Sequence, residues 1–239
     1  MQKLKFLFII VASIFLITSC GDEECADGYC ADSIPGKPFV TVWKTDNEGI
    51  SKDNQVIITV DSKNYTYNYN IDCDSDGILE AKNLTGDYTC NYDTPGTYTI
   101  SISGEYPRFY IYGLSTKTDK LKLIRLKQWG TQKWKTARAM FSAFKNLVID
   151  AVDEPDFSEV TDMSYMFANA NSFNTDISHW DVSKITDMEY MFFLNKSFNQ
   201  DLSSWDVSNV TNCRTFNAGT DDSWTLPKPN FTKCTIRTE

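Results

Sequence analysis

SFNTDISHWDVSKITDMEYMF, residues 172–192, and SFNQDLSSWDVSNVTNCRTFN, residues 197–217, are two copies of one sequence unit. The copies begin 25 positions apart, and tryptophan, phenylalanine and aspartate recur at matching places in both. Self-similarity at a period of this length is typical of proteins built from stacked repeats, in which each unit packs against its neighbours. Because such stacks offer extended surfaces and not closed pockets, the pattern favours binding over catalysis.

Weaker copies precede the two matching ones. One period before Trp180, residues 155–163 keep the pattern, and a further step with a slip of one residue reaches Trp129. The last copy departs from the pattern at Cys213. End repeats must shield a stack from water, so altered end copies are expected. We therefore predict about three copies and a C-terminal cap over residues 115–239.

Within one copy, the pattern predicts a short strand, a turn, a short helix and a second turn. Trp180 and Val182 alternate around an aspartate, as the inward residues of a strand do. Thr186 and Glu189 have the spacing of a capping box at a helix start. Apolar residues at i, i+3 and i+4 from Met188 would give that helix an inner face.

The first 19 residues have the character of a secretory signal. Lys3 and Lys5 precede an apolar run over residues 6–16, which is too short and wrongly flanked to span a membrane. The small residues before Cys20 resemble the bacterial lipobox, which implies cleavage there and lipid attachment to Cys20. The alternative is an ordinary signal with Cys20 as a structural thiol.

Residues 20–37 are predicted to form an acidic tether. Its start, Gly-Asp-Glu-Glu at 21–24, resembles the export tag that sends some lipoproteins to the outer face of the outer membrane. The alternative is the start of a solvated linker. Removal of Lys3 and Lys5 with the signal would change the formal net charge from −9 to −11, which excludes nucleic acid as an electrostatic partner.

Six cysteines remain once Cys20 carries lipid, and an even count in an exported chain predicts disulfides. Zinc is the alternative, but the chain has one histidine and no Cys-x-x-Cys pair. Proximity in the sequence suggests three pairs among the fifteen pairings that six cysteines allow: Cys25 with Cys30, Cys73 with Cys90, and Cys213 with Cys234.

Residues 38–114 are β-rich stretches separated by Asp, Asn, Gly and Pro, which predicts a small β-sandwich. Residues 70–77 and 92–100 resemble the PKD-type immunoglobulin-like fold. In that family a tryptophan precedes the first turn and a histidine lies in the second element, and Cys73 and Cys90 occupy those places here. The resemblance therefore adds to the case that these two cysteines pair.

Asp72, Asp74 and Asp76, followed by Gly77, resemble the start of a calcium loop, because hard cations bind several convergent oxygens. A full loop would carry an acidic residue twelve positions in, where this chain has an asparagine, and only Glu80 is near. The alternative is a polar turn that the aspartates stabilise through their own backbone.

The lipobox, the PKD-like segment and the WDVSNVT repeats together resemble BspA-type leucine-rich-repeat surface lipoproteins. The resemblance implies an α+β chain, a small β-sandwich followed by a short solenoid of leucine-rich-repeat-like strand–turn–helix units. It also implies a lipid anchor in the outer membrane, exposure at the cell surface and adhesion to host matrix proteins or other cell-surface proteins and glycans. Trp, Val and Met fill positions where the common consensus has Leu, and about three copies offer less surface than long members do.

Repeat positions that differ between copies and point outward are the contact candidates: Thr175 and Gln200, His179 and Ser204, Lys184 and Asn209. Asp156, Asp181 and Asp206 would stack about 5 Å apart, either as a cation-binding row or as caps of turns within their own copies. Trp180 and Trp205 are expected in the core.

Catalytic spacings such as GxSxG, HExxH and the P-loop do not occur. We therefore expect a protein that is not an enzyme and needs no cofactor, with a structural Ca²⁺ at Asp72, Asp74 and Asp76 as the alternative. Two further hypotheses are a structural or accessory envelope lipoprotein without a specific ligand and, less favoured, a hydrolase that uses paired carboxylates.

Overall fold

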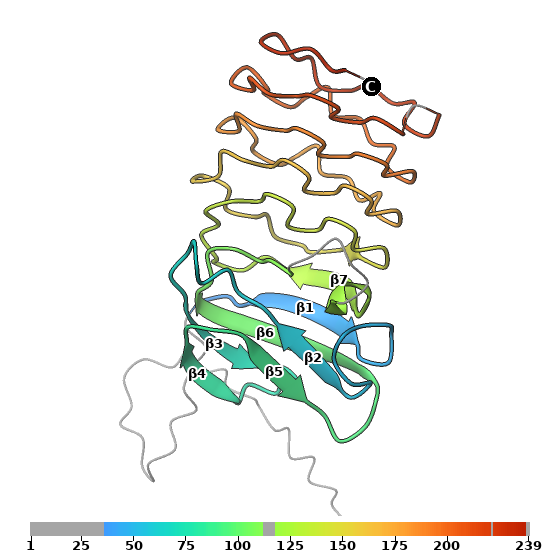
Figure 1. Ribbon diagram of the computed structural model, residues 1–239. Coiled ribbons are helices and arrows are strands. Elements are labelled where there is room, and N and C mark those ends of the chain that lie inside the picture. The colour runs from blue at the N-terminus through green and yellow to red at the C-terminus, as the bar shows by residue number, and fades with distance from the viewer. Residues whose placement is uncertain (1–35, 112–117, 221, 238–239) are drawn as a thin grey trace, which may run out of the picture. The chain divides into compact units, whose positions relative to one another are not determined.

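The computed structural model describes residues 36–111, 118–220 and 222–237 (Figure 1). The chain divides into two units, Met1–Ala31 and Asp32–Glu239. The predicted signal, the predicted lipid attachment at Cys20 and the predicted Cys25–Cys30 pair lie outside the described residues. In the part of the chain that the structure describes, no helix is long and apolar enough to cross a membrane.

Two sheets account for the regular structure. The larger has the strand order β4-β3-β6-β1-β7-β8, and the smaller pairs β2 with β5. The strands are β1 (Phe39–Lys44), β2 (Gln55–Ile58), β3 (Asn68–Asp72), β4 (Ala81–Leu84), β5 (Tyr88–Asn91), β6 (Thr97–Glu105), β7 (Leu123–Gln128) and β8 (Val148–Ile149).

Strand β1 joins segments that are far apart in the sequence, because it lies between β6 and β7 (Figure 1). Thr41 pairs with Ile100 on one side and with Leu126 on the other. Both pairings are antiparallel, whereas β7 and β8 are parallel. The sheet therefore continues from the β-rich segment into the part of the chain that holds the first repeat copy, and Phe39 packs edge-on against Trp134 at 5.1 Å.

The repeat copies contain turns where a helix was predicted. Within the described ranges, the sole helix is the 3-10 helix η1 (Asp119–Leu121), which precedes β7. The predicted strand–turn–helix unit is therefore wrong, and so is the α+β class. The described chain is nearly all β-structure and turns, and its sheets do not form a solenoid. We call each folded repeat copy a coil.

Backbone hydrogen bonding explains why the predicted helix does not form. Met188 and Tyr190 donate their N–H groups to the carbonyls of Asn212 and Arg214 in the next coil, at 2.8 and 3.0 Å. The N–H of Met191 closes a local turn on the carbonyl of Met188 at 3.3 Å. An α-helix would use these donors within its own segment and leave none for the neighbouring coil. The bonds between coils therefore replace those of a helix.

Left-handed residues recur at the same places in successive coils and interrupt any right-handed helix. Tyr165 and Tyr190 have φ of 60° and 55°, and Asn169 and Leu194 have φ of 57° and 53°. This conformation costs about 1–2 kcal/mol for a residue with a side chain. The capping-box residues also have other partners: the N–H of Glu189 bonds to the carboxylate of Asp187, at 2.8 Å.

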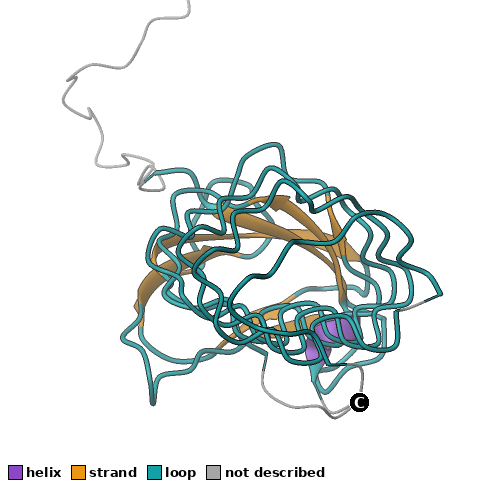
Figure 2. Ribbon diagram, turned by 90° about the horizontal axis from the view of Figure 1, so that it is seen from above, coloured by secondary structure: helices purple, strands orange, loops and turns teal. Residues whose placement is uncertain are grey.

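Aromatic side chains at equivalent positions stack through the coils and form their core. Phe141, Phe167 and Phe192 stack on one another with ring centroids 5.8 and 5.6 Å apart. Phe216, which matches Met191 in the repeat, packs edge-on against Phe192 at 5.3 Å. Seen from above in Figure 2, successive coils lie over one another, in agreement with the bonds between them. Trp180 and Trp205 are buried, as expected for core residues.

The last coil is covered by the C-terminal segment. Trp224 packs edge-on against Phe198 at 4.8 Å and donates its indole N–H to the carbonyl of Gln200 at 2.9 Å. The Cys213–Cys234 disulfide, with Cα atoms 5.8 Å apart, holds this segment to the coil. The apolar end of the stack is thereby shielded from water.

Candidate functional site

The six predicted contact residues lie on the outside of the coils. His179, Ser204, Lys184 and Asn209 are exposed, and Thr175 and Gln200 are half-buried. Four of the six donate side-chain hydrogen bonds to backbone carbonyls of the preceding coil. These bonds join Thr175 to Ile149 (2.8 Å), Gln200 to Asn174 (2.9 Å), Ser204 to Ser178 (3.2 Å) and Asn209 to Ser183 (2.9 Å).

These four side chains therefore hold adjacent coils together. Within the described residues, no bond of this kind ties His179 or Lys184, so the two exposed basic members of the set stay available for contacts. The structure thus separates the six predicted contact residues into four that link coils and two that do not, a distinction that the sequence does not show. Outward position alone does not separate a contact residue from one that links the coils.

The repeated aspartates cap turns within their own coils. Asp156, Asp181 and Asp206 each accept the N–H of the serine two residues on, at 3.0 Å in all three cases. Hydrogen bonds from that serine, side chain first and backbone second, hold the pKa of each aspartate below its usual value. The carboxylates therefore cap turns within their own coils, which is the alternative to a cation-binding row.

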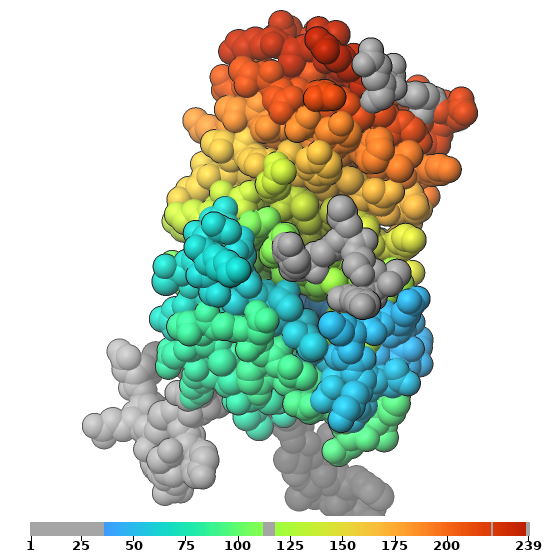
Figure 3. All heavy atoms as spheres, in the orientation of Figure 1, coloured from blue at the N-terminus to red at the C-terminus, as the bar shows by residue number. Residues whose placement is uncertain are grey.

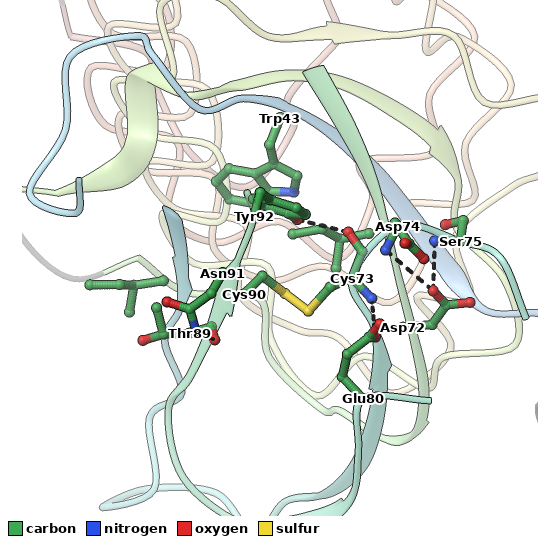
Figure 4. The surroundings of a disulfide bond; sticks show 12 residues. Trp43, Asp72, Cys73, Asp74, Ser75, Glu80, Thr89, Cys90, Asn91 and Tyr92 are labelled. Carbon is green, nitrogen blue, oxygen red and sulfur yellow. Dashed lines mark hydrogen bonds between the residues drawn. A yellow bond between two sulfur atoms is a disulfide. The ribbon is translucent and has the colours of Figure 1, made fainter. Parts of the chain in front are cut away.

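The acidic loop after β3 lies beside the Cys73–Cys90 disulfide, whose Cα atoms are 5.7 Å apart (Figure 4). Carboxylate oxygens of Asp72, Asp74 and Glu80 lie within 4.8 Å of one another. Asp76, the third member of the predicted calcium set, accepts the N–H of Ile78 at 2.7 Å and does not belong to this group.

Backbone donors already occupy much of this acidic cluster. Asp72 is buried and accepts the N–H groups of Ser75 and Gly77 at 2.6 and 2.9 Å. Glu80 accepts the N–H of Cys73 at 2.6 Å, and burial raises the pKa of Glu80 (Figure 4). The bonding is that of a polar turn stabilised by its own side chains, the alternative to a calcium loop.

An open groove of about 540 Å³ lies where the loop after β2 meets the first coil. We call it the arginine groove. Its lining is Val60, Asp61, Ser62, Lys63, Asn64, Arg108, Tyr110 and Arg138. No sequence motif points to these residues, since they come from three separate segments and follow no repeat spacing.

Arg108 is fixed at the centre of the arginine groove. Its guanidinium pairs with Asp61 at 2.6 Å and lies 4.0 Å from the centroid of the Tyr110 ring. A second nitrogen donates to the carbonyl of Arg138 at 3.4 Å, which ties the loop segment to the first coil. Since the Arg108 side chain is only 11% exposed, these contacts leave it little freedom to move.

Two stacked tyrosines continue the arginine groove along the coils. The Arg138 guanidinium lies 5.4 Å from the centroid of the Tyr165 ring. Tyr165 stacks on Tyr190, with centroids 4.8 Å apart and an angle of 13° between the rings. Both tyrosines are half-buried, and we call them the tyrosine pair. Burial raises the pKa of Tyr165, so its hydroxyl stays neutral.

One family matches part of the chain. The family described as "Mycoplasma protein of unknown function, DUF285" matches residues 112–223, which contain the repeat coils. The match covers less than half of the chain and does not include the β-rich segment before the coils. Neither the curated proteins nor the solved structures gave a match.

Proposed function

We propose that this chain is a surface-anchored bacterial lipoprotein that binds a protein or glycan through the outer face of its repeat coils. The observation that carries the proposal is the stack itself. Backbone bonds between coils and a continuous aromatic core hold outward side chains at fixed spacing, and a rigid display of this kind is suited to recognition.

Sequence resemblances support the lipid anchor and the surface location in this proposal. The lipobox before Cys20 implies a lipid anchor, and the acidic residues at 21–24 imply export to the cell surface. The WDVSNVT repeats resemble those of BspA-type surface lipoproteins, which are associated with adhesion. A repeat-type family match over residues 112–223 is compatible with this assignment.

A structural or accessory envelope role is the second candidate. The observation that favours it is the use of Thr175, Gln200, Ser204 and Asn209 as links between coils. If most outward polar groups only hold the stack together, the chain would act as a spacer and would need no specific ligand.

Protease shaving of intact cells, followed by antibody detection, tests the surface assignment. The matched control is Cys20→Ala, which cannot carry the lipid. Digestion of the wild-type protein on intact cells supports a surface binding role, and a matrix-protein and glycan array would then identify the ligand. Protection until the outer membrane is broken would refute surface adhesion and favour the envelope role.

A further inference from the structure

We infer that the arginine groove and the adjoining tyrosine pair bind a carboxylate-bearing glycan, an inference that rests on the proposed function and names its ligand class. The site consists of Lys63, Arg108 and Arg138 as cationic groups, with the stacked rings of Tyr165 and Tyr190 beside them.

Charge is the first argument. The whole chain carries a formal net charge of −9, yet three basic residues and a single acidic one, Asp61, line the arginine groove. Asp61 pairs with Arg108, and Asp162 lies 3.6 Å from Arg138, so three cations stand against two carboxylates and one positive charge is left over. A local excess of positive charge on an acidic protein attracts small anionic groups, whereas the overall charge repels a dense polyanion such as nucleic acid.

Arg138 has the donor geometry that a carboxylate requires. Its side chain is 49% exposed, and among the described residues its guanidinium is bonded only through Nη1, to the Ser164 hydroxyl at 2.5 Å. Asp162 lies 3.6 Å from the same nitrogen. A guanidinium has five N–H donors in a fixed fork, so further donors remain for a bidentate bond to a ligand carboxylate.

Arg108 supplies a fixed positive charge beside Arg138. It is held on the Tyr110 ring and by Asp61, so binding would cost little side-chain entropy. Its Nε is buried without a hydrogen-bond partner among the described atoms. Buried polar groups are nearly always paired, and exceptions of this kind call for an explanation such as a functional role.

The tyrosine pair favours a sugar over a peptide as the bearer of the carboxylate. Its half-buried rings lie face to face, so a ligand meets their edges and a hydroxyl on each ring, which suit the C–H groups and hydroxyls of sugar rings. Ser62 and Asn64 add a hydroxyl and an amide group to the lining of the arginine groove. In the space-filling view, the cyan surface near residues 60–65 adjoins the yellow-green surface of the first coil (Figure 3).

Calorimetric titration of the full chain with a hyaluronan oligosaccharide tests the inference. The comparison probes are the carboxyl-reduced oligosaccharide and polyglutamate. We expect binding of the carboxylated sugar only, weakened by added salt. Arg138→Gln and Tyr165→Ala should each weaken it about tenfold, as expected for loss of a charge-assisted bond or a ring contact. Arg138→Lys should restore part of the affinity, since it keeps the charge and loses the fork.

Lys145→Gln is the matched control, because it removes an exposed charge from the first coil without touching the arginine groove or the predicted contact residues. Thermal unfolding of every variant shows whether it folds. Equal binding of the reduced sugar, preference for polyglutamate, or no binding by folded wild-type protein would overturn the inference. The proposed function would survive these results if the array finds another ligand, and it would fail separately if intact cells protect the protein from protease.

Discussion

Replacing Lys122 by methionine should destabilise the protein by about 3–5 kcal/mol, the usual cost of removing one partner of a buried ion pair. The Lys122 side chain is 0% exposed, and its ammonium donates to the carbonyls of Ser51, Lys52 and Gln55 at 3.1, 2.8 and 3.1 Å. It also bonds to the Ser51 hydroxyl at 2.6 Å, and Asp119 lies 3.9 Å away. Methionine fills a similar volume but removes the charge and every bond that the ammonium donates to this loop.

Asp119 makes the matching contribution to the same loop. Its carboxylate accepts the N–H groups of Ile50, Ser51 and Ile57 at 2.9, 3.1 and 2.8 Å. Asp119→Ala should therefore cost a similar amount, because a buried donor left without an acceptor costs about 1–3 kcal/mol. The double variant should lose less than the sum, since the two residues serve one network.

Urea unfolding under oxidising conditions, followed by fluorescence, measures these losses. A loss of 3–5 kcal/mol is a large part of the total of about 5–15 kcal/mol that is usual for a folded domain. The exposed Lys184→Met is the control and should change stability by less than about 0.5 kcal/mol. If Lys122→Met cost no more than this control, the argument that the ammonium organises the loop would be refuted.

Three further predictions concern the capped turns, the disulfide and a glycine. Because the pKa of each capped aspartate is lowered in the folded protein, its stabilising effect is present above the usual pKa and is lost as pH falls through the lowered pKa. Ser158→Ala removes one hydrogen bond to Asp156, so the pH at which this stability is lost should rise in a pH series of unfolding curves. Opening the Cys73–Cys90 disulfide, which spans 17 positions, should cost about 3 kcal/mol, measured as a shift in urea midpoint between the wild type and the double alanine variant. Gly130→Ala should cost more than about 1 kcal/mol by thermal unfolding, because φ at Gly130 is 70° and the new Cβ would lie 2.3 Å from the Lys37 carbonyl oxygen. At Gly86 an added Cβ meets nothing within 4 Å, so the control Gly86→Ala should be close to neutral.

Several features could be predicted from the sequence because they depend on spacing or on short-range chemistry. The 25-residue offset places Phe167 and Phe192 at equivalent points of successive coils, where they stack. The burial of Trp180 and Trp205 follows from the same repetition. The aspartate caps involve residues two positions apart, so a local pattern contains all their partners.

The helix prediction failed because the local signal did not include the neighbouring coil. Thr186, Glu189 and the apolar residues after Met188 fit a capped helix. In the stack, however, alternate N–H groups donate to carbonyls of the next coil. Tyr190 has a left-handed backbone conformation, which interrupts a right-handed helix at this point. Bonds between coils repeat along the stack, whereas a helix of one or two turns has many unpaired end groups.

The sequence by itself determined that repeats stack and that Trp180 and Trp205 belong to the core, because both follow from periodicity. It gave turn capping as one of two roles for the aspartates, and the structure decided between them. Only the tertiary structure decided how the backbone donors are shared, that β1 pairs with β7, and where Arg108 meets Arg138. The physical reason is separation along the chain. The arginine groove joins segments 30 or more residues apart, so its charge and shape exist only once the sheet and the first coil have packed together.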